Sequence, residues 1–289
     1  MVFARDVLIS LRPKQWYKNS LLFVCLVFAG HLQNASMWTT LLLSAAFFCL
    51  LTSCEYIIND IFDREKDSKH PVKKNRPIAA GRVGVRTGIL IASALGTIAL
   101  VGSYFMVNFN FFCIAAGYLA LLLLYTLVLK HIIIADVITI AMGFVIRAVA
   151  GCLAIDVTIS PWLIICTFLL AMFLALEKRW DELVLLADDA EDHRPTLSQY
   201  STTLLEHFTT ITVAATIVAY LMYTTLAQHY ATMLTAPFAI YGLLRYMYLV
   251  HYKKQGGDPV VLFRDKALMV NLAIWGLLML VMSLRGILV

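Results

Sequence analysis

The chain has 289 residues, of which 61% are hydrophobic and only 14% charged, and it carries a formal net charge of +5. Soluble domains are about 45–50% apolar and about 25% charged, so this composition excludes a soluble domain and indicates an integral membrane protein. The modest excess of basic residues fits membrane topology and phosphate binding, and gives no reason to expect a nucleic-acid partner.

The first 19 residues are mixed polar and apolar and lack the layout of a secretory signal. Trp16 and Tyr17 are typical of the headgroup level of a membrane, and basic residues flank them. We therefore predict an interfacial amphipathic segment over 1–19, in which Lys14 and Lys18 face anionic lipid or phosphate.

Apolar stretches of membrane-spanning length recur about nine times along the chain. The predicted fold class is an all-α integral membrane protein with about nine transmembrane helices. Lys and Arg fall almost wholly in alternate loops, so the positive-inside rule places the N-terminus and the charged loops on the cytoplasmic side of the plasma (inner) membrane. The expected spans lie near 20–36, 38–59, 87–107, 111–129, 132–153, 161–177, 203–227, 233–250 and 267–287.

An acidic motif follows directly from the second apolar stretch, where Asp60, Asp63 and Asp67 are spaced i, i+3 and i+7 on one helix face. With Asn59 they offer hard oxygen ligands, which suit Mg²⁺ held together with substrate phosphate oxygens. We predict that Asp60, Asp63 and Asp67 are catalytic and, with Asn59, bind Mg²⁺ on a diphosphate. A solvated helix end is the alternative, but unpaired carboxylates at a membrane boundary are costly.

The motif opens a cytoplasmic loop over 60–86, in which Pro71 and Pro77 end the helix and basic residues follow the acids. Lys73 and Arg76 are predicted to bind phosphate, Arg76 through its planar fork. For Lys73, a role as a topological anchor at the membrane surface is an equal alternative to phosphate binding.

A second charged loop over 177–200 again mixes acids and bases. Lys178 and Glu182 are one helical turn apart, as are Glu177 and Asp181, so two neighbouring faces carry phosphate-site candidates. Four spans separate the two loops, a spacing that suggests two four-helix units and places both loops over one opening. The substrate-binding candidates of this loop are Lys178, Arg179, Glu182 and Arg194.

Inside the membrane, Asp136 and Arg147 need an explanation, because intramembrane charges usually face a cavity or a partner. Their spacing of eleven residues places them on the same helix face. We expect Arg147 to contact substrate, with a buried salt-bridge network as the alternative. Tyr125 and Lys130, at the cytoplasmic end of the fourth span, are further substrate-binding candidates.

The motif Asn59-Asp60-x-x-Asp63-x-x-x-Asp67 resembles the NDxxDxxxD signature of the UbiA-type intramembrane prenyltransferase superfamily. The resemblance covers nearly the whole chain. It implies a single transmembrane transferase domain over 1–289, with helices around a cavity open to the cytoplasmic side and the bilayer, and Mg²⁺-diphosphate chemistry.

Within this superfamily the chain is most similar to the decaprenyl-phosphate phosphoribosyltransferases. That resemblance implies transfer of 5-phosphoribose from phosphoribosyl pyrophosphate to a polyprenyl phosphate, with the basic residues of both loops on the donor and Lys14 and Lys18 on the lipid phosphate. The supporting stretches are Arg12 to Asn19, His70 to Gly81, Lys178-Arg179 with Glu182, and Asp258 to Asp265.

Glu177 and Asp181 depart from the pattern of that branch and partly restore an acid-x-x-x-acid spacing. This spacing keeps open the alternative of a prenyltransferase that moves an isoprenoid from its diphosphate to an aromatic or other small acceptor. The sequence also leaves open whether the chain forms a homo-oligomer.

Overall fold

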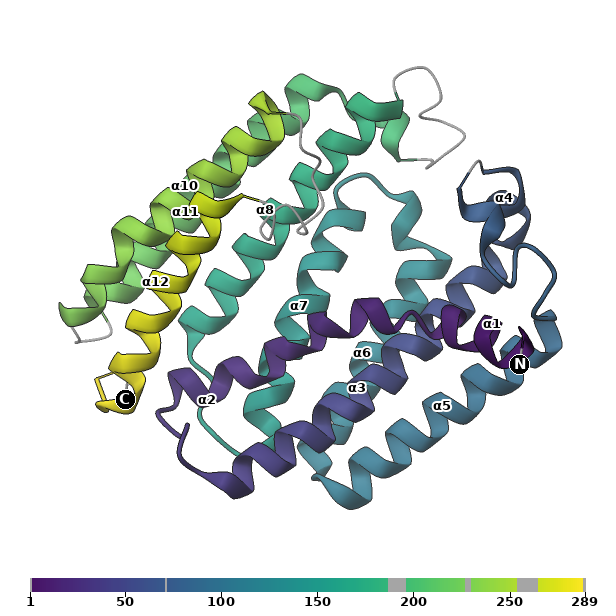
Figure 1. Ribbon diagram of the computed structural model, residues 1–289, viewed down its shortest axis with the longest axis horizontal. Coiled ribbons are helices and arrows are strands. Elements are labelled where there is room, and N and C mark those ends of the chain that lie inside the picture. The colour runs from purple at the N-terminus through teal and green to yellow at the C-terminus, as the bar shows by residue number, and fades with distance from the viewer. Residues whose placement is uncertain (1, 71, 187–195, 227–229, 254–264, 288–289) are drawn as a thin grey trace.

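The computed structural model describes residues 2–70, 72–186, 196–226, 230–253 and 265–287, and every regular element in these ranges is helical (Figure 1). The elements are α1 (Val2–Leu11), η1 (Pro13–Phe23), α2 (Val24–Phe28), α3 (Ala35–Phe62), α4 (Arg64–Lys69), η2 (Lys73–Asn75), α5 (Val85–Met106), α6 (Phe109–Leu127), η3 (Leu129–His131), α7 (Ala135–Ala154), α8 (Pro161–Leu186), η5 (Leu197–Gln199), α10 (Thr202–Leu226), η6 (Tyr230–Thr235), α11 (Ala236–Met247), η7 (Tyr248–Tyr252) and α12 (Lys266–Leu284).

Eight helices in the described part of the chain are long and apolar enough to cross a membrane. They coincide with the last eight of the nine expected spans, because each apolar stretch is long enough for its helix to bridge the hydrocarbon core. The expected all-α membrane fold is confirmed, and the protein is an integral multi-pass membrane protein.

The first expected span, 20–36, takes a different form. A 3₁₀ helix, η1, begins at Pro13 and continues into the short α2, which ends at Phe28. Because a 3₁₀ helix rises about 2.0 Å per residue instead of 1.5 Å, the run of η1 and α2 extends roughly 30 Å, close to the thickness of the hydrocarbon core. It packs against both α3 and α7 (Figure 1).

A glycine on α7 permits this packing. A Cβ atom added at Gly151 would lie 2.0 Å from the carbonyl oxygen of Leu22 in η1. Such a contact is far below van der Waals distance, so η1 would have to move away from α7 to admit any side chain.

We therefore expect Gly151→Ala to destabilise the protein by about 1–3 kcal/mol, the usual cost of overpacking a close contact. The measurement is thermal unfolding of the detergent-solubilised protein. Gly117→Ala on α6 is the matched control, because no atom beyond the local backbone of its own helix lies within 4 Å of its added Cβ. Equal unfolding temperatures for the two variants would contradict the close contact.

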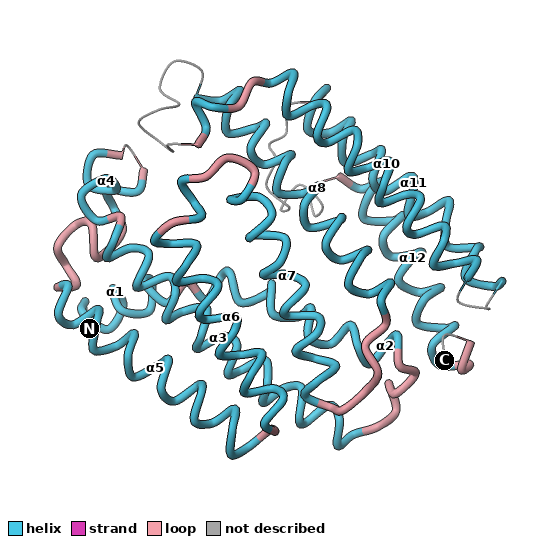
Figure 2. The backbone as a smooth tube through the Cα atoms, turned by 180° about the vertical axis from the view of Figure 1, so that it is seen from behind, coloured by secondary structure: helices cyan, strands magenta, loops and turns pink. Residues whose placement is uncertain are grey.

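The spanning helices pack in chain order from α5 to α12, and α12 returns to contact α2. At this closure the Ser283 hydroxyl donates a hydrogen bond of 2.6 Å to the carbonyl oxygen of Val27. Figure 2 shows α4 and the α6–α7 connection at one end of the bundle, and the α2–α3 turn and the C-terminal end of α12 at the other. The two ends therefore differ in chemistry, since the acidic motif lies only at the first.

Candidate functional site

The acidic motif begins inside a helix, because α3 continues to Phe62 and Asp63 is its C-cap. Asp60 and Asp67 are buried, with 2% and 3% of their surface exposed, whereas Asp63 and Asn59 are half-buried. The short helix α4 follows and carries Asp67. Helix α3 therefore continues to the first part of the motif, and α4 returns the last aspartate toward it.

Each aspartate of the motif is paired with a cation from another segment. Nη1 of Arg76 lies 3.1 Å from Oδ1 of Asp60 and 2.6 Å from Oδ2 of Asp67. Nζ of Lys130, in η3, lies 2.6 Å from Oδ1 of Asp63. Arg76 and Lys130 were both expected at the substrate site, and the structure brings both to the acidic motif.

A third cation comes from the N-terminal segment. Nη2 of Arg12 lies 2.5 Å from Oδ1 of Asp60, and its guanidinium carbon is 4.6 Å from the centre of the Tyr56 ring. Arg12 has a left-handed backbone (φ 51°, ψ 58°), which is strained for a residue other than glycine and typical of functional sites. The junction between α1 and η1 is therefore part of the site.

Lys73 connects the first charged loop to the second. The charged neighbours of its ammonium group are Arg76, Asp67, Glu182 and Asp63. Burial, and after it the nearby Arg76, lowers the pKa of Lys73 below its ordinary value. Since Glu182 belongs to α8, the two charged regions face each other as expected from their spacing.

Arg179 is held inside the protein. Its guanidinium is 2% exposed, and it donates to Oδ2 of Asp136 at 3.1 Å and to Oε2 of Glu182 at 2.8 Å. The Tyr200 hydroxyl donates to the other oxygen of Asp136, and burial, followed by the charge of Asp136, raises the pKa of Tyr200 to about 12. Lys178, by contrast, is exposed. Of the two adjacent cations, Lys178 is the one available to a ligand in this arrangement.

Arg147 lies apart from Asp136, although the two share a helix. Its guanidinium donates to Oδ1 of Asn19 at 2.9 Å, to the carbonyl oxygen of Gly143 at 2.8 Å and to the Tyr118 hydroxyl. It is 6% exposed. The buried network that was the alternative for these charges is therefore present, but it consists of separate clusters around Asp136 and around Arg147.

Glu177 lies on another side of α8. It precedes Arg179 by two positions, which corresponds to a rotation of about 200° around the helix. Its Oε1 is 3.0 Å from Nε2 of His251, in the π-helical turn η7. Glu177 thus pairs with His251, and it is not among the charged neighbours of Lys73.

The donor set suits a hard divalent cation. In the described residues no three His, Cys, Asp or Glu side chains already converge on a metal-sized site. Carboxylate oxygens of Asp60 and Asp67 nevertheless both lie within 3.1 Å of one cationic nitrogen of Arg76. Hard oxygen ligands around a single positive centre are what Mg²⁺ requires, so these residues fit the expected ion.

Other predicted residues lie at various distances from this centre. The ionisable neighbours of Tyr125 are Arg179, Asp136, Glu55 and Glu182, which belong to α3, α7 and α8. Lys14 is exposed near the start of η1, and Lys18 is half-buried at its middle. Arg194 lies outside the described residues.

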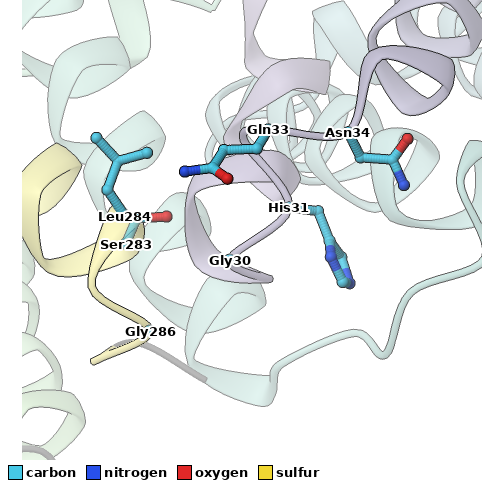
Figure 3. Close-up of a pocket in the computed structure, with 7 residues that line it drawn as sticks. All are labelled: Gly30, His31, Gln33, Asn34, Ser283, Leu284 and Gly286. Atoms are coloured by element: carbon cyan, nitrogen blue, oxygen red, sulfur yellow. The ribbon is translucent and has the colours of Figure 1, made fainter.

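A pocket of about 430 Å³ lies between the α2–α3 turn and the end of α12 (Figure 3). Asn34, which lines it, caps the start of α3, whereas Asp60 lies near the end of the same helix. Twenty-six residues of helix separate the two, or about 40 Å. This pocket therefore does not belong to the site around the acidic motif.

Residues 20–283 match the model of the UbiA prenyltransferase family. A decaprenyl-phosphate phosphoribosyltransferase of Corynebacterium glutamicum is 32% identical, over 92% of this chain and 83% of the relative. The enzyme of that name from Mycobacterium tuberculosis (strain H37Rv) is 30% identical, over 92% of this chain and 90% of the relative.

The fold is also similar to solved structures. A UbiA homolog from Archaeoglobus fulgidus bound to GPP and Mg²⁺ aligns with a TM-score of 0.76 at 18% identity, over 98% of this chain and 99% of that chain. A digeranylgeranylglyceryl phosphate synthase aligns with a TM-score of 0.72, also at 18% identity, over 99% of this chain and 100% of that chain. The family match over most of the chain and this agreement in fold lead to one conclusion: the protein belongs to the UbiA prenyltransferase family.

Proposed function

We propose that the protein transfers 5-phosphoribose from phosphoribosyl pyrophosphate to a polyprenyl phosphate of the decaprenyl type and releases diphosphate. The reaction depends on Mg²⁺ and takes place in one transferase domain, 1–289, in a cavity open to the cytoplasmic side and the bilayer of the plasma membrane. Two relatives named for this reaction, at 30% and 32% identity over most of the chain, support it.

One observation carries the proposal: each carboxylate of the acidic motif forms an ion pair with a basic side chain. Arg12, Arg76 and Lys130 pair with the motif, and Lys73 lies beside it. Two substrates that both carry phosphate repel each other, so a site that joins them needs more positive charge than a metal alone supplies. An isoprenoid transfer to an uncharged acceptor has no such need.

Asp60, Asp63 and Asp67, with Asn59, would hold Mg²⁺ beside the diphosphate of the donor. When bound, Mg²⁺ neutralises the charge that develops on the leaving group. The position of Arg76 beside two of these carboxylates supports a role in which its planar fork binds diphosphate oxygens in two parallel hydrogen bonds.

The bond between the anomeric carbon and the diphosphate oxygen breaks, and an oxygen of the lipid phosphate forms the new bond to the same carbon. That oxygen is already ionised at neutral pH, so the reaction needs no general base. Lys14 and Lys18 bind the lipid phosphate near the membrane surface.

Lys178→Ala is expected to raise the KM for phosphoribosyl pyrophosphate about tenfold, the effect of losing one charge-assisted hydrogen bond, without lowering the unfolding temperature. Lys253→Ala is the control, because Lys253 is an exposed cation that follows η7. If both variants show the KM of the unchanged protein, Lys178 serves only as a topological anchor.

The experiment that tests the function uses purified protein, Mg²⁺, phosphoribosyl pyrophosphate labelled in the ribose, and decaprenyl phosphate. Label should enter the organic phase and return to water as ribose phosphate after mild acid treatment. No lipid-borne label in any fraction, with protein shown to be folded, would contradict the proposal.

A further inference from the structure

Glu55 is a buried carboxylate one helical turn before the acidic motif. It lies on α3 and is 8% exposed. In the described part of the chain no hydrogen bond or ion pair within bonding distance reaches it, and its oxygens are not among the fully enclosed, unpaired polar atoms. The carboxylate is therefore largely buried but keeps some accessible surface.

The groups around Glu55 are those of the site. Arg12, Arg147 and Lys18 are its cationic neighbours, and Asp60 is its acidic one. Arg12 is bonded to Asp60, further along α3. Arg147 is bonded to Asn19, whose amide donates to Thr52 Oγ1, earlier on α3. Along the helix axis, Glu55 thus lies at a level between the two guanidinium groups.

A purely structural role as a counter-ion fits these contacts poorly. The hydrogen bonds of Arg12 go to Asp60, and those of Arg147 go to Asn19, Gly143 and Tyr118. A buried carboxylate without hydrogen bonds costs free energy, and ionisable groups inside membrane domains usually mark a substrate or ion pathway.

The negative charge of Glu55 indicates which chemical group of a ligand would bind it. A carboxylate repels phosphate and gives an isoprenoid chain no contact, so its complement is a hydroxyl group that donates hydrogen bonds. Carboxylates recognise ribose hydroxyls in this way in dinucleotide sites. Glu55 precedes Asn59 by four residues, about 6 Å along the axis, a separation that a sugar bonded to a motif-held diphosphate can span.

We propose that Glu55 accepts hydrogen bonds from the ribose hydroxyls of the donor and selects a sugar diphosphate over a prenyl diphosphate. The proposal rests on the proposed function. It makes Glu55 a specificity-determining residue of the donor site.

The test compares two ligands that share the diphosphate and differ in the sugar. Equilibrium binding of phosphoribosyl pyrophosphate and of inorganic diphosphate, each with Mg²⁺, is measured on the purified protein and on Glu55→Ala. Loss of hydrogen bonds to a charged acceptor should weaken phosphoribosyl pyrophosphate about 10- to 100-fold. Inorganic diphosphate has no sugar hydroxyls and should bind the variant as it binds the unchanged protein.

Two further variants separate recognition from folding. Glu55→Gln keeps the side-chain volume and should also weaken only the sugar ligand, which preserves the test if Glu55→Ala unfolds. Glu177→Gln is the matched control, a buried glutamate directed to His251, and should leave the ratio of the two affinities unchanged.

Equal weakening of both ligands, or no weakening of either, would overturn the role of Glu55. Failure of the unchanged protein to bind phosphoribosyl pyrophosphate while it binds inorganic diphosphate would instead overturn the proposed function. The two failures are therefore distinguishable in one set of measurements.

Discussion

Asp60→Asn and Asp63→Asn are each expected to lower kcat by about two to four orders of magnitude, while the protein still folds. Each substitution keeps the shape of the side chain and removes the negative charge that binds Mg²⁺. A metal that stabilises the leaving group contributes several kcal/mol, and each 1.36 kcal/mol changes the rate about tenfold. Initial rates at saturating Mg²⁺ measure the effect, and a chelator should abolish the activity of the unchanged protein.

Asp156→Asn is the control for this pair. Asp156 is an exposed aspartate that follows α7 at the opposite end of the bundle, with a left-handed backbone that asparagine tolerates. Its rate should equal that of the unchanged protein. Near-normal rates for both Asp60→Asn and Asp63→Asn would contradict a diphosphate site at the acidic motif.

Arg179→Gln is expected to destabilise the protein by about 3–5 kcal/mol, because it leaves Asp136 buried without its cation. The guanidinium is 2% exposed and Asp136 is fully buried, so water cannot replace the lost partner. Thermal unfolding in detergent measures the loss. The double variant Arg179→Gln with Asp136→Asn should recover part of it, since both buried charges are then absent.

The adjacent Lys178→Ala serves as the control, because Lys178 is exposed and its loss should leave the unfolding temperature unchanged. An unchanged unfolding temperature for Arg179→Gln, together with weaker binding of phosphoribosyl pyrophosphate, would contradict the structural role. Arg179 would then be the phosphate ligand expected from the sequence pattern.

Much of the fold could be predicted from the sequence because the length of an apolar stretch directly limits what can cross a bilayer. Eight expected spans coincide with eight long helices. The type of helix at the start of segment 20–36 could not be predicted, because its hydropathy does not distinguish the 3₁₀ geometry of η1 from an α-helix. That geometry depends on packing between α3 and α7, including the close approach at Gly151.

The spacing of the three aspartates predicts that they lie on one helix face, but it does not identify the basic residues that pair with them. Arg12 reaches Asp60 across 48 residues through a left-handed turn, which no local pattern predicts. For Glu177 and Arg179 the helical rotation between them was calculable, but only packing decides which one faces the site. Glu55 could have been recognised as a candidate from the sequence, because it is an acidic residue within an apolar span, like Asp136.

The most direct test offers the protein both donors and both acceptors at once: phosphoribosyl pyrophosphate, a prenyl diphosphate, decaprenyl phosphate and an aromatic acid, with Mg²⁺. Mass spectrometry of the products then reports which transfer occurs, with Asp60→Asn as the inactive control. The proposed function predicts a decaprenyl phosphate that carries 5-phosphoribose, and no prenylated aromatic. A prenylated aromatic with no ribosylated lipid would contradict it.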